Sequence, residues 1–566
     1  MELSGMSSIF ISKVAINHLQ SSMDRITLTF LVLFIAGMAT AQPHFTRQDT
    51  LRGSITPERA WWDLKYYHLD IVVNPADSTI EGKNTVIYSV LQQSQVMQID
   101  LQPPLIISKA VQNGKSLQIV REGNAHFISL ETVQTPGTLQ ELVVFYGGKP
   151  RVALRPPWDG GITWQKDENG LPFIASSCQG IGASIWWPCK DHMYDEVDSM
   201  LISVNVPGNL VNVSNGRLRK VDTLDNNTKT WHWFVSNPIN NYGVNINIGD
   251  YVQFSEKFAG EKGELDLDYW VLRNNLEIAK RQFKEVPRMM KAFEYWFGPY
   301  PFYDDSYKLV EVPYLGMEHQ SSITYGNGYQ NGYRGMDLSD SGWGLKFDFI
   351  IVHESGHEWF ANNITYKDMA DMWIHEGFTN YSENLFVEYY FGKEAGAAYV
   401  KGTRKRIRND RPEIGFYGVN YSGSGDMYNK GGNMLHTLRQ IVNDDEKWRS
   451  MLRGLNQEFY HQTVTTVQIE DFLSEKSGRC LSSFFDQYLR DIRIPVFEYE
   501  VKDGTIHFRW SNCVGDFDMP IRIYSSGEEI WLNPKTNWSQ AAIGTDSQAI
   551  KVDSGFYVAV LNVTGK

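Results

Sequence analysis

The hydrophobic pattern of this chain changes its period twice, and this change limits the folds that the chain can adopt. From about residue 50 to residue 262, apolar and polar residues alternate in short runs such as Tyr67 to Val73 and Ile80 to Tyr88. Gly, Asn and Pro separate the runs at short intervals, which is typical of an antiparallel sandwich or barrel. The sequence therefore predicts an N-terminal antiparallel β domain.

Beyond Asn274, apolar residues recur at helical spacing. Helical patterns continue to about Arg493, interrupted by the loop-like segments 303–345 and 409–427, and alternation returns from Val496 onwards. Since 566 residues are too many for one ordinary core, we predict a multidomain α+β protein. Its predicted parts are an N-terminal β domain at 42–262, a mainly helical domain at 263–495 and a small C-terminal β-sandwich at 496–566.

The charge of the chain argues against nucleic acid as a partner. The formal net charge is −13, whereas phosphate binding needs a basic surface. The basic run from Lys401 to Arg408 is interpreted as one solvated helix face. A hydrophobic content of 42% and a charged content of 21% are those of a soluble globular protein.

The four cysteines, Cys178, Cys189, Cys480 and Cys513, are too few for a disulfide scaffold. No C-x-x-C pair suggests metal or redox chemistry. One or two bridges are compatible with an exported protein, and the sequence assigns none.

The N-terminus carries an apolar segment from Ile26 to Ala41 that is too short to span a membrane comfortably. It ends in Ala39-Thr40-Ala41 directly before Gln42, which is typical of a signal peptidase site. The 22-residue segment before Met23 is too long and polar to be the start of a signal peptide, so we expect translation to begin at Met23. The mature protein would then be periplasmic or secreted, with no stable membrane anchor; an uncleaved N-terminal anchor is the alternative.

One segment carries an H-E-x-x-H pattern at His353, Glu354 and His357. Positions four apart on a helix share a face, so both imidazoles can bind one metal ion. Glu354 lies one step round the helix, where a carboxylate can take a proton from water as a general base. For this motif alone, two histidines on a metal-free core helix are the alternative.

Glu376 offers a third metal ligand, with 18 residues between it and His357, at the start of a second helical pattern. Two His and one Glu leave the fourth position of zinc open, as in catalytic sites, so we expect one Zn²⁺ per chain. Glu383 lies two turns further along the same face. It could accept the free ring N–H of a ligand histidine; an ordinary solvated Glu is the alternative.

The pattern H-E-x-x-H, followed after 18 residues by the Glu of W-x-x-E-G-F, resembles the zinc signature of the aminopeptidase N family of gluzincins, which includes the leukotriene hydrolase aminopeptidases. The likeness extends from about residue 60 to residue 500 through further motifs in the family's order. These are Ser177-Cys178-Gln179 with Trp187 to Asp191, FEYWFGPYPF at 293–302, Tyr314 to His319 where the family has G-A-M-E-N, Met427 to Gly431, and FFDQYLRDIRIPVFEY at 484–499.

The resemblance implies a thermolysin-like catalytic domain and a zinc aminopeptidase acting on peptides with a free N-terminus. Hydrolysis would use zinc-activated water, with Glu354 as general base and Tyr428 as the hydroxyl that stabilises the oxyanion. Glu318, helped by Gln179, would bind the substrate's α-ammonium group. The substrate-binding residues carried over from the family motifs are Gln179, Gly316, Met317 and Glu318.

Two features depart from the family. Gly316 and His319 stand where the family has alanine and asparagine, and a protonated His319 beside Glu318 would weaken amine binding at low pH. The chain also ends soon after the small β module, so we expect a short form lacking the large C-terminal helical domain. The rival hypotheses are a thermolysin-type endopeptidase with the same zinc ligands, epoxide hydrolysis at the same site, and a binding module without catalysis.

Overall fold

The computed structural model describes residues 44–543 and 550–564. The expected signal segment from Ile26 to Ala41, the start at Met23 and the cleavage site before Gln42 lie outside these residues. Within the described ranges, no helix is long and apolar enough to cross a membrane.

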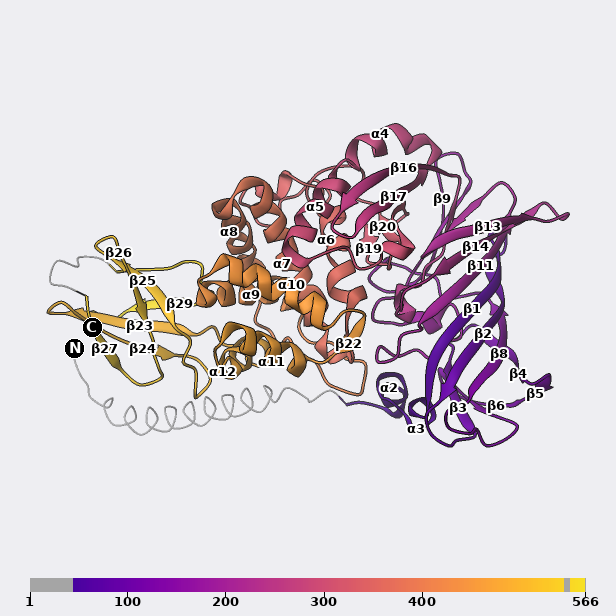
Figure 1. Ribbon diagram of the computed structural model, residues 1–566, viewed down its shortest axis with the longest axis horizontal. Helices are drawn as coiled ribbons and strands as arrows, with labels where there is room; N and C mark the ends of the chain where they lie inside the picture. Colours follow the sequence, from indigo (N-terminus) through magenta and orange to yellow (C-terminus); the bar gives the residue numbers. More distant parts are fainter. Residues whose placement is uncertain (1–43, 544–549, 565–566) are drawn as a thin grey trace, which may run out of the picture. The chain divides into compact units, whose positions relative to one another are not determined.

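The largest sheet has eight strands in the order β13-β14-β11-β1-β2-β8-β4-β5, and Figure 1 shows its long strands side by side. Burial alternates along β1, as the sequence pattern predicts. The strands are β1 (Trp62–Asn74), β2 (Thr79–Val90), β4 (Ile106–Gln112), β5 (Lys115–Ser116), β8 (Leu139–Gly148), β11 (Ser199–Pro207), β13 (Arg217–Thr223) and β14 (Thr228–Val235).

The prediction of a purely antiparallel sheet is wrong at one pair. Strands β1 and β11 run parallel, with Tyr66 opposite Ser199 and Val72 opposite Asn205. Parallel neighbours need a long connection, and more than a hundred residues separate these two strands. The alternating pattern reports which face a residue occupies, but not the direction of its neighbouring strand.

Two smaller sheets complete the N-terminal β region. In the four-stranded sheet β12-β15-β10-β9, strand β10 (Pro172–Ser177) ends two residues before Gln179 and so brings that side chain toward the cleft described below. A three-stranded sheet has the order β3-β7-β6. The remaining elements are α2 (Arg47–Gly53), α3 (Pro57–Ala60), β3 (Val96–Asp100), β6 (Gln118–Glu122), β7 (Ala125–Ser129), β9 (Gly161–Lys166), β12 (Val211–Val213) and β15 (Asn247–Gly249).

A five-stranded sheet, in the order β16-β17-β18-β20-β19, leads into the helical part. The predicted domain boundary between residues 262 and 263 falls in the turn of the β16–β17 hairpin, whose strands belong to one sheet. The segment 303–345 was expected to be loop-like, yet it contains three short strands. The strands are β16 (Tyr251–Gly260), β17 (Gly263–Leu272), β18 (Tyr307–Glu311), β19 (Gly316–Met317) and β20 (Ile323–Tyr325).

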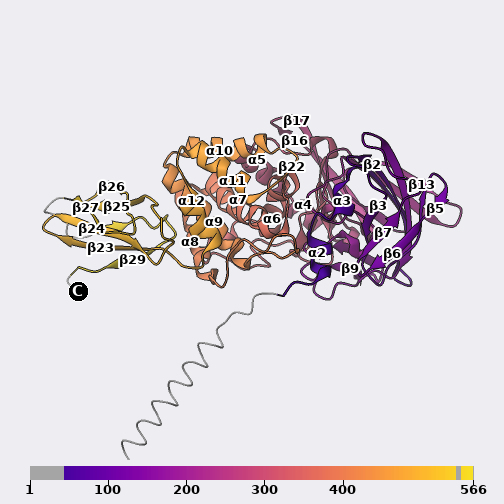
Figure 2. The same ribbon diagram turned by 90° about the horizontal axis from the view of Figure 1, so that it is seen from below.

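The helical pattern after Asn274 forms two helices, α4 (Leu276–Gln282) and α5 (Glu285–Phe297), and α5 ends at Gly298 as predicted. Pro287 explains the break, because proline has no N–H to donate and fits only the first turn of a helix. Figure 2 shows the remaining helices gathered around α7. They are α6 (Phe349–Gly356), α7 (Trp373–Phe391), α8 (Lys393–Gly402), α9 (Asn429–Val442), α10 (Asp445–Glu458), α11 (Thr466–Ser477) and α12 (Ser482–Phe485), with the short parallel strands β21 (Ile364–Tyr366) and β22 (Gln462–Val464) beside them.

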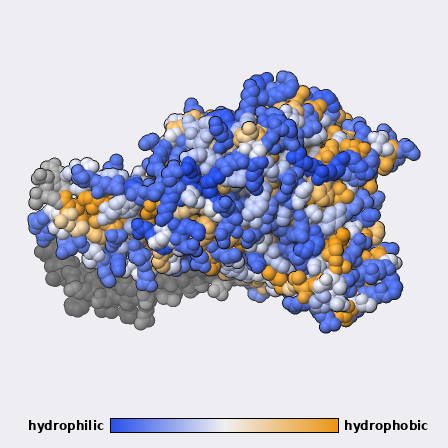
Figure 3. All heavy atoms as spheres, viewed as in Figure 1, coloured by the Kyte–Doolittle hydropathy of each residue, from blue (hydrophilic) through white to orange (hydrophobic). Residues whose placement is uncertain are grey.

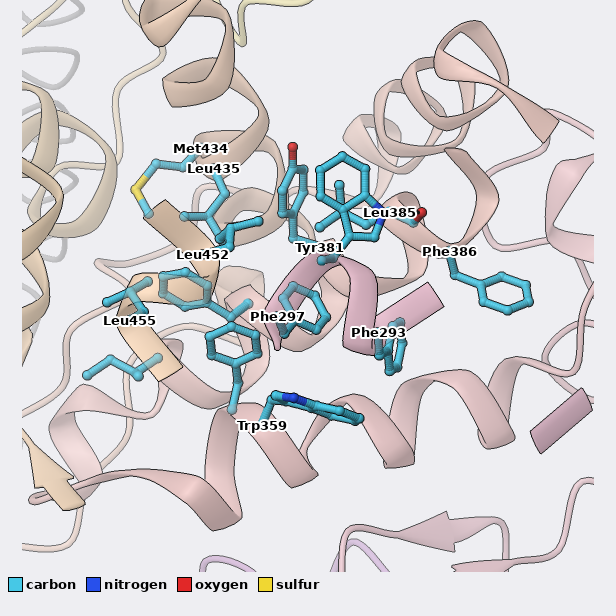
Figure 4. Packing of buried hydrophobic residues seen from close by; sticks show 14 of the residues in the cluster. Phe293, Phe297, Trp359, Tyr381, Leu385, Phe386, Met434, Leu435, Leu452 and Leu455 are labelled. Atoms are coloured by element: carbon cyan, nitrogen blue, oxygen red, sulfur yellow. Dashed lines mark hydrogen bonds between the residues drawn. The ribbon is translucent and has the colours of Figure 1, made fainter. Parts of the chain in front are cut away.

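Aromatic side chains fill the core of the helical part. Figure 4 shows Phe293 and Phe297 of α5 next to Trp359, which follows the metal-binding motif. The rings of Phe293 and Trp359 meet edge to face, with centroids 5.6 Å apart. Such pairs add about 0.5–1.5 kcal/mol to the effect of burial alone. This core supports α6 and α7, the helices that carry the site.

The C-terminal tail forms strands, as its alternation predicts, and two pairs of them are hairpins, β23–β24 and β25–β26. Asp503-Gly504 and Ser526-Gly527 make their two-residue turns with positive φ at both positions, as type I′ turns require. The sheet orders are β27-β24-β23-β29 and β26-β25-β28. The arrangement of these sheets as a sandwich, and the three-domain division, stay predictions. The strands are β23 (Val496–Lys502), β24 (Thr505–Ser511), β25 (Ile521–Ser525), β26 (Glu528–Leu532), β27 (Ser539–Ala542), β28 (Ile550–Val552) and β29 (Ala559–Asn562).

The interpretation of the basic run as one solvated helix face is wrong. Helix α8 ends at Gly402, and a tighter turn from Thr403 to Arg406 sends the side chains in different directions. Arg404 donates to Asn433 and to two backbone carbonyls of the C-terminal part, whereas Arg406 lines a cleft.

The surface in view in Figure 3 consists mostly of hydrophilic residues, with apolar ones in small scattered groups. Single exposed apolar residues are normal on globular proteins. All four cysteines are free thiols, and two of them, Cys178 and Cys189, are buried.

Candidate active site

Helix α6 carries the first two residues of the motif, and a capping side chain fixes its N-terminus. Asp348 caps the helix, and its Oδ1 accepts the backbone N–H groups of Ile350 and Ile351 at 3.1 and 3.4 Å. A capping carboxylate of this kind satisfies donors that have no partner within the helix. The apolar residues up to Val352 are buried, so the helix is held by the core while His353 and Glu354 face the cleft.

The chain takes a longer path from α6 to α7 than a simple turn. His357 ends α6, and the backbone then leaves helical geometry at Phe360 and Ala361 before strand β21 and a short turn at Met369–Asp371. Helix α7 follows, with Glu376 in its first turn. The two helices pack together, and this contact brings Glu376 beside both histidines.

Three donor atoms converge at this point. Glu376 Oε2 lies 3.4 Å from His357 Nε2 and 3.9 Å from His353 Nε2. All three side chains are buried, and Glu376 Oε2 has no hydrogen-bond partner among the described residues. A buried carboxylate oxygen without a donor is costly unless something else satisfies it. The orphaned oxygen facing two imidazole nitrogens therefore fits a metal ion.

The Nδ1 atoms of both histidines already have hydrogen-bond partners within the protein. His353 Nδ1 lies 2.7 Å from Glu383 Oε1, and His357 Nδ1 lies 3.0 Å from Thr379 Oγ1 and 3.2 Å from the carbonyl of Phe360. These contacts leave both Nε2 atoms free to bind a metal. Metal-binding histidines commonly have their second ring nitrogen hydrogen-bonded in this way, which orients the ring. Two His and one Glu with free donor atoms match the three-ligand set of catalytic zinc.

Glu383 is itself held in place. The Tyr399 hydroxyl donates to Glu383 Oε2 at 2.6 Å, so one carboxylate oxygen faces His353 and the other faces Tyr399. The solvated position considered for Glu383 is therefore wrong, because its side chain is 1% exposed.

The carboxylate of Glu354 lies beside His353, His357 and Glu376 but is not one of their three converging donors. It is buried at the cleft wall, and burial raises its pKa above the ordinary glutamate value. Its carboxylate, that of Glu318 and a nitrogen of His357 lie within 4.8 Å of one another. A raised pKa close to neutrality suits a residue that accepts a proton and later releases it.

Glu318 is the buried anion at the other side of the cleft. Its Oε1 accepts hydrogen bonds from Gln179 Nε2 at 2.6 Å and from the Tyr242 hydroxyl at 3.2 Å. Gln179 also donates to Glu376 Oε1 at 3.1 Å, so this one amide joins the N-terminal β region to a metal-ligand residue. Asn362 holds the same loop by donating to the Glu318 carbonyl at 2.9 Å.

Strand β19 places Gly316 and Met317 on the cleft wall next to Glu318. A Cβ atom at Gly316 would lie 2.7 Å from Ile350 Cγ2 and 3.2 Å from Glu354 Cγ. The glycine therefore allows the strand to approach α6 closely. This contact gives a physical reason for the small residue at that position.

The expectation that a protonated His319 weakens amine binding is wrong. His319 is fully buried, its Nδ1 contacts Thr324 Oγ1 at 3.3 Å, and burial lowers its pKa to about 3. The imidazole is therefore neutral at any pH near neutrality. No hydrogen bond or ion pair joins it to Glu318 among the described residues.

Tyr428 approaches the metal group from the start of helix α9. Its ring lies nearly parallel to that of His353, with centroids 6.1 Å apart, and it lines the same cleft as Glu354. Close packing of α9 on α7 positions it, since a Cβ at Gly431 would lie 2.9 Å from Gly377 Cα. Burial, together with the Glu376 charge, raises the pKa of its phenol, so the hydroxyl remains a donor.

These residues border one cleft of about 670 Å³. All of the site residues inferred from the sequence line it except Glu383, which lies behind His353. Sequence reasoning missed Thr379, Tyr399 and Tyr242, which hold site residues, and Trp158 and Arg406, which line the cleft. Only Thr379 had a usable signal, because it lies three residues after Glu376 on the same helix.

Comparison with known proteins agrees with this geometry. The profile of the Peptidase family M1 domain matches residues 281–414, a range that contains Glu318 and all three metal-binding residues. The chain contains a peptidase family M1 domain. Zinc is the metal that this domain and this donor set indicate.

Three relatives are about a quarter identical to this chain over the aligned residues. Leukotriene A-4 hydrolase of Xenopus laevis is 24% identical over 74% of this chain and 68% of its own length. Aminopeptidase B of Mus musculus is 24% identical over 63% of this chain, and aminopeptidase N of Lactococcus lactis is 26% identical over 38%. The matches span 52% and 26% of those two proteins, so the chain aligns with only part of their length.

Solved structures share the fold. A mutant of the M1 zinc metallopeptidase from Deinococcus radiodurans superposes with a TM-score of 0.65 at 22% identity, covering 77% of this chain and 97% of that one. The same mutant bound to a Tyr-Ser-Ala substrate gives a TM-score of 0.63 at 21% identity over 77% and 96%. The multidomain α+β fold, with a large β-sheet region and a helical part, is thus that of M1 peptidases.

Proposed function

We propose that this protein is a zinc-dependent aminopeptidase that removes the N-terminal residue from peptides. The observation that carries the proposal is one cleft holding a convergent His-His-Glu group, the neighbouring carboxylate of Glu354 and a separate buried anion, Glu318. Relatives named aminopeptidase B and aminopeptidase N support the same reaction class.

His353, His357 and Glu376 would hold the zinc ion. When bound, zinc supplies a Lewis acid that lowers the pKa of water to about 7 and polarises a carbonyl group. Glu354 takes the proton from the attacking water and later gives it to the leaving nitrogen. Its buried position keeps the carboxylate away from bulk water while it carries that proton.

Tyr428 supplies a donor for the developing oxyanion. Its hydroxyl remains protonated and can donate to the carbonyl oxygen of the scissile bond as negative charge develops there. The packing of α9 on α7 fixes this donor before the substrate arrives, so little reorganisation accompanies the reaction.

Glu318 would select a free N-terminus. Its buried carboxylate has two neutral donors, Gln179 and Tyr242, and no cation hydrogen-bonded to it among the described residues. An α-ammonium group supplies that cation, whereas an internal peptide segment leaves the anion unpaired at a cost of several kcal/mol. A thermolysin-type endopeptidase has no need of this anion.

The proposal is tested by measuring the turnover of aminoacyl-anilides and of their N-acetylated counterparts, each with and without a chelator. We expect turnover of the free amines only, complete loss with chelator, and recovery on adding zinc. Equal cleavage of free and acetylated substrates would contradict the aminopeptidase assignment and favour an endopeptidase with the same metal site.

We also propose that the chain is exported after cleavage between Ala41 and Gln42. The apolar segment from Ile26 and the small residues before Gln42 support this proposal. N-terminal sequencing of the native protein should give Gln42 as the first residue. A mature protein that retains residues before Met23 would contradict both the cleavage site and the start site.

A further inference from the structure

The position of the Gln179 amide depends on the turn that carries it. This amide donates to Glu318 at 2.6 Å and to Glu376 at 3.1 Å, so a small shift of its backbone would break one or both hydrogen bonds. The turn contains Gly180 and Gly182, whose φ angles are 76° and 95°. Glycine allows such a turn but does not make it rigid. Neighbouring groups must therefore hold the turn in place.

Arg52, near the end of helix α2, lies directly against this turn. A Cβ atom at Gly182 would lie 2.0 Å from Arg52 Nη2 and 2.4 Å from Asp191 Oδ2, so these two groups cover the glycine closely. Arg52 Nη1 pairs with Asp191 Oδ2 at 3.0 Å and donates to the Asp191 carbonyl at 2.6 Å. Asp191 Oδ2 also accepts the backbone N–H of Ser184 at 3.1 Å. One ion pair thus holds the turn after Gln179 at Gly182 and at Ser184.

The residue after Arg52 contacts a second loop at the cleft. A Cβ atom at Gly53 would lie 2.0 Å from the backbone nitrogen of Asn420, so the two segments approach as closely as only glycine permits. Asn420 Nδ2 donates to the carbonyl of Gly180 at 3.0 Å and so holds the same turn from the helical part. Gly180 and Asn420 line the cleft, whereas Arg52 does not. Arg52 therefore acts on the site through the turn and not by contact with the substrate.

Asp191 is itself fixed in the N-terminal β region. Its backbone N–H donates to Asp100 Oδ2 at 3.2 Å, and the buried Arg59 donates to the same oxygen at 2.6 Å. The side chains of Arg52 and Asp191 are 16% and 5% exposed, so water screens their attraction less than that of a surface pair. Loss of Arg52 would leave a buried carboxylate without the cation that neutralises it. The turn bonded to that carboxylate would then shift.

We infer that Arg52 is a positioning residue for recognition of the substrate's free amine, because it fixes the turn that directs the Gln179 amide to Glu318. The inference rests on the proposed aminopeptidase function and extends the amine site to a residue outside the cleft. When the turn shifts, Glu318 loses the shorter of its hydrogen bonds to Gln179 and Tyr242. Because the amine is bound both before and during the reaction, this loss should raise KM and leave kcat nearly unchanged.

A double-mutant cycle tests whether Arg52 acts through Gln179. KM and kcat for an alanine anilide are measured for the zinc-loaded wild type, Arg52→Gln, Gln179→Ala and the double variant. We expect each single variant to raise KM about tenfold, the lower end for loss of a hydrogen bond to a charged group. The double variant should also raise KM about tenfold and not about a hundredfold, because residues that act through one contact are not additive. Arg52→Lys keeps the cation and should raise KM less than Arg52→Gln.

Gly182→Ala provides a second route to the same readout if Arg52→Gln fails to fold. It keeps the ion pair but places a methyl group against the guanidinium, at a φ angle that alanine rarely adopts. The turn should move, and KM should rise as in Arg52→Gln. The same substitution should have little further effect on KM in the Gln179→Ala background.

Arg522→Gln is the matched control. It breaks an ion pair with Asp553 whose side chains are 13% and 14% exposed, and neither residue lines the cleft. It should leave KM unchanged. An unchanged KM in the Arg52 and Gly182 variants, effects that multiply with that of Gln179→Ala, or an equal rise in Arg522→Gln would overturn the inference while leaving the proposed function intact. Failure of the wild type to cleave the anilide would overturn the proposed function, and the inference with it.

Discussion

At the scale of single residues, Glu354 separates metal binding from catalysis. It does not belong to the converging His353, His357 and Glu376 atoms, although its carboxylate lies close to His357. Replacing Glu354 with Gln should therefore leave one zinc per chain and lower kcat by about 100- to 10,000-fold, because the amide cannot accept the proton. Metal analysis and kcat measured on the same preparation check this prediction. Near-normal turnover by the variant would show that another group is the base.

Tyr428 should influence the rate more than substrate binding. Its hydroxyl donates to the negative charge that develops on the carbonyl oxygen only as the carbonyl carbon becomes tetrahedral. Tyr428→Phe should therefore reduce kcat by about 100-fold with little change in KM. Steady-state kinetics on an aminoacyl-anilide decide the point. A defect confined to KM would instead assign Tyr428 to substrate positioning.

At the scale of elements, α7 carries both a metal ligand and a residue that orients another. Glu376 and Glu383 lie seven residues apart on one face, and Tyr399 of α8 fixes Glu383. Loss of an outer partner of this kind typically weakens metal binding by about 10- to 100-fold. We expect Glu383→Ala to show that loss in competition with a zinc chelator, and Tyr399→Phe a smaller one. Unchanged zinc affinity in Glu383→Ala would remove the orienting role.

The elements also show what sequence can predict. The shared face of His353 and His357, and that of Glu376 and Glu383, follow from local spacing, since residues four or seven apart share a helix face. The parallel pairing of β1 with β11, the contact of Gln179 with Glu376 and the path of Arg406 into the cleft depend on tertiary packing. No local pattern encodes them. His319 shows the same limit, because its neutral state results from burial and not from its neighbours in sequence.

At the scale of the whole molecule, buried titratable groups set the dependence of stability on pH. Burial lowers the pKa of His126 to about 4, of His192 to about 3 and of His461 to about 4. Unfolded histidines titrate near 6.5. Between these values the unfolded chain binds more protons, so the histidines reduce stability as the pH falls from about 6.5 to about 3.

Buried carboxyl groups act in the opposite direction over a different range. Burial raises the pKa of Glu285 to about 7 and of Asp348 to about 6, against about 4 when unfolded. There the folded state binds more protons, so these groups increase stability as the pH falls from about 7 to about 4. We therefore expect the melting temperature to change little between about pH 6.5 and 4.5 and to fall steeply below about pH 4. There the carboxyl offset has ended, and carboxylates such as Asp266 and Asp491, whose pKa is lowered by hydrogen bonds from Lys257 and Arg493, lose stability as they are protonated. Thermal melts of the zinc-free protein across this range test the prediction, and His192→Gln should make the fall less steep. A steady decline beginning at pH 6.5 would mean that the carboxyl groups do not offset the histidines.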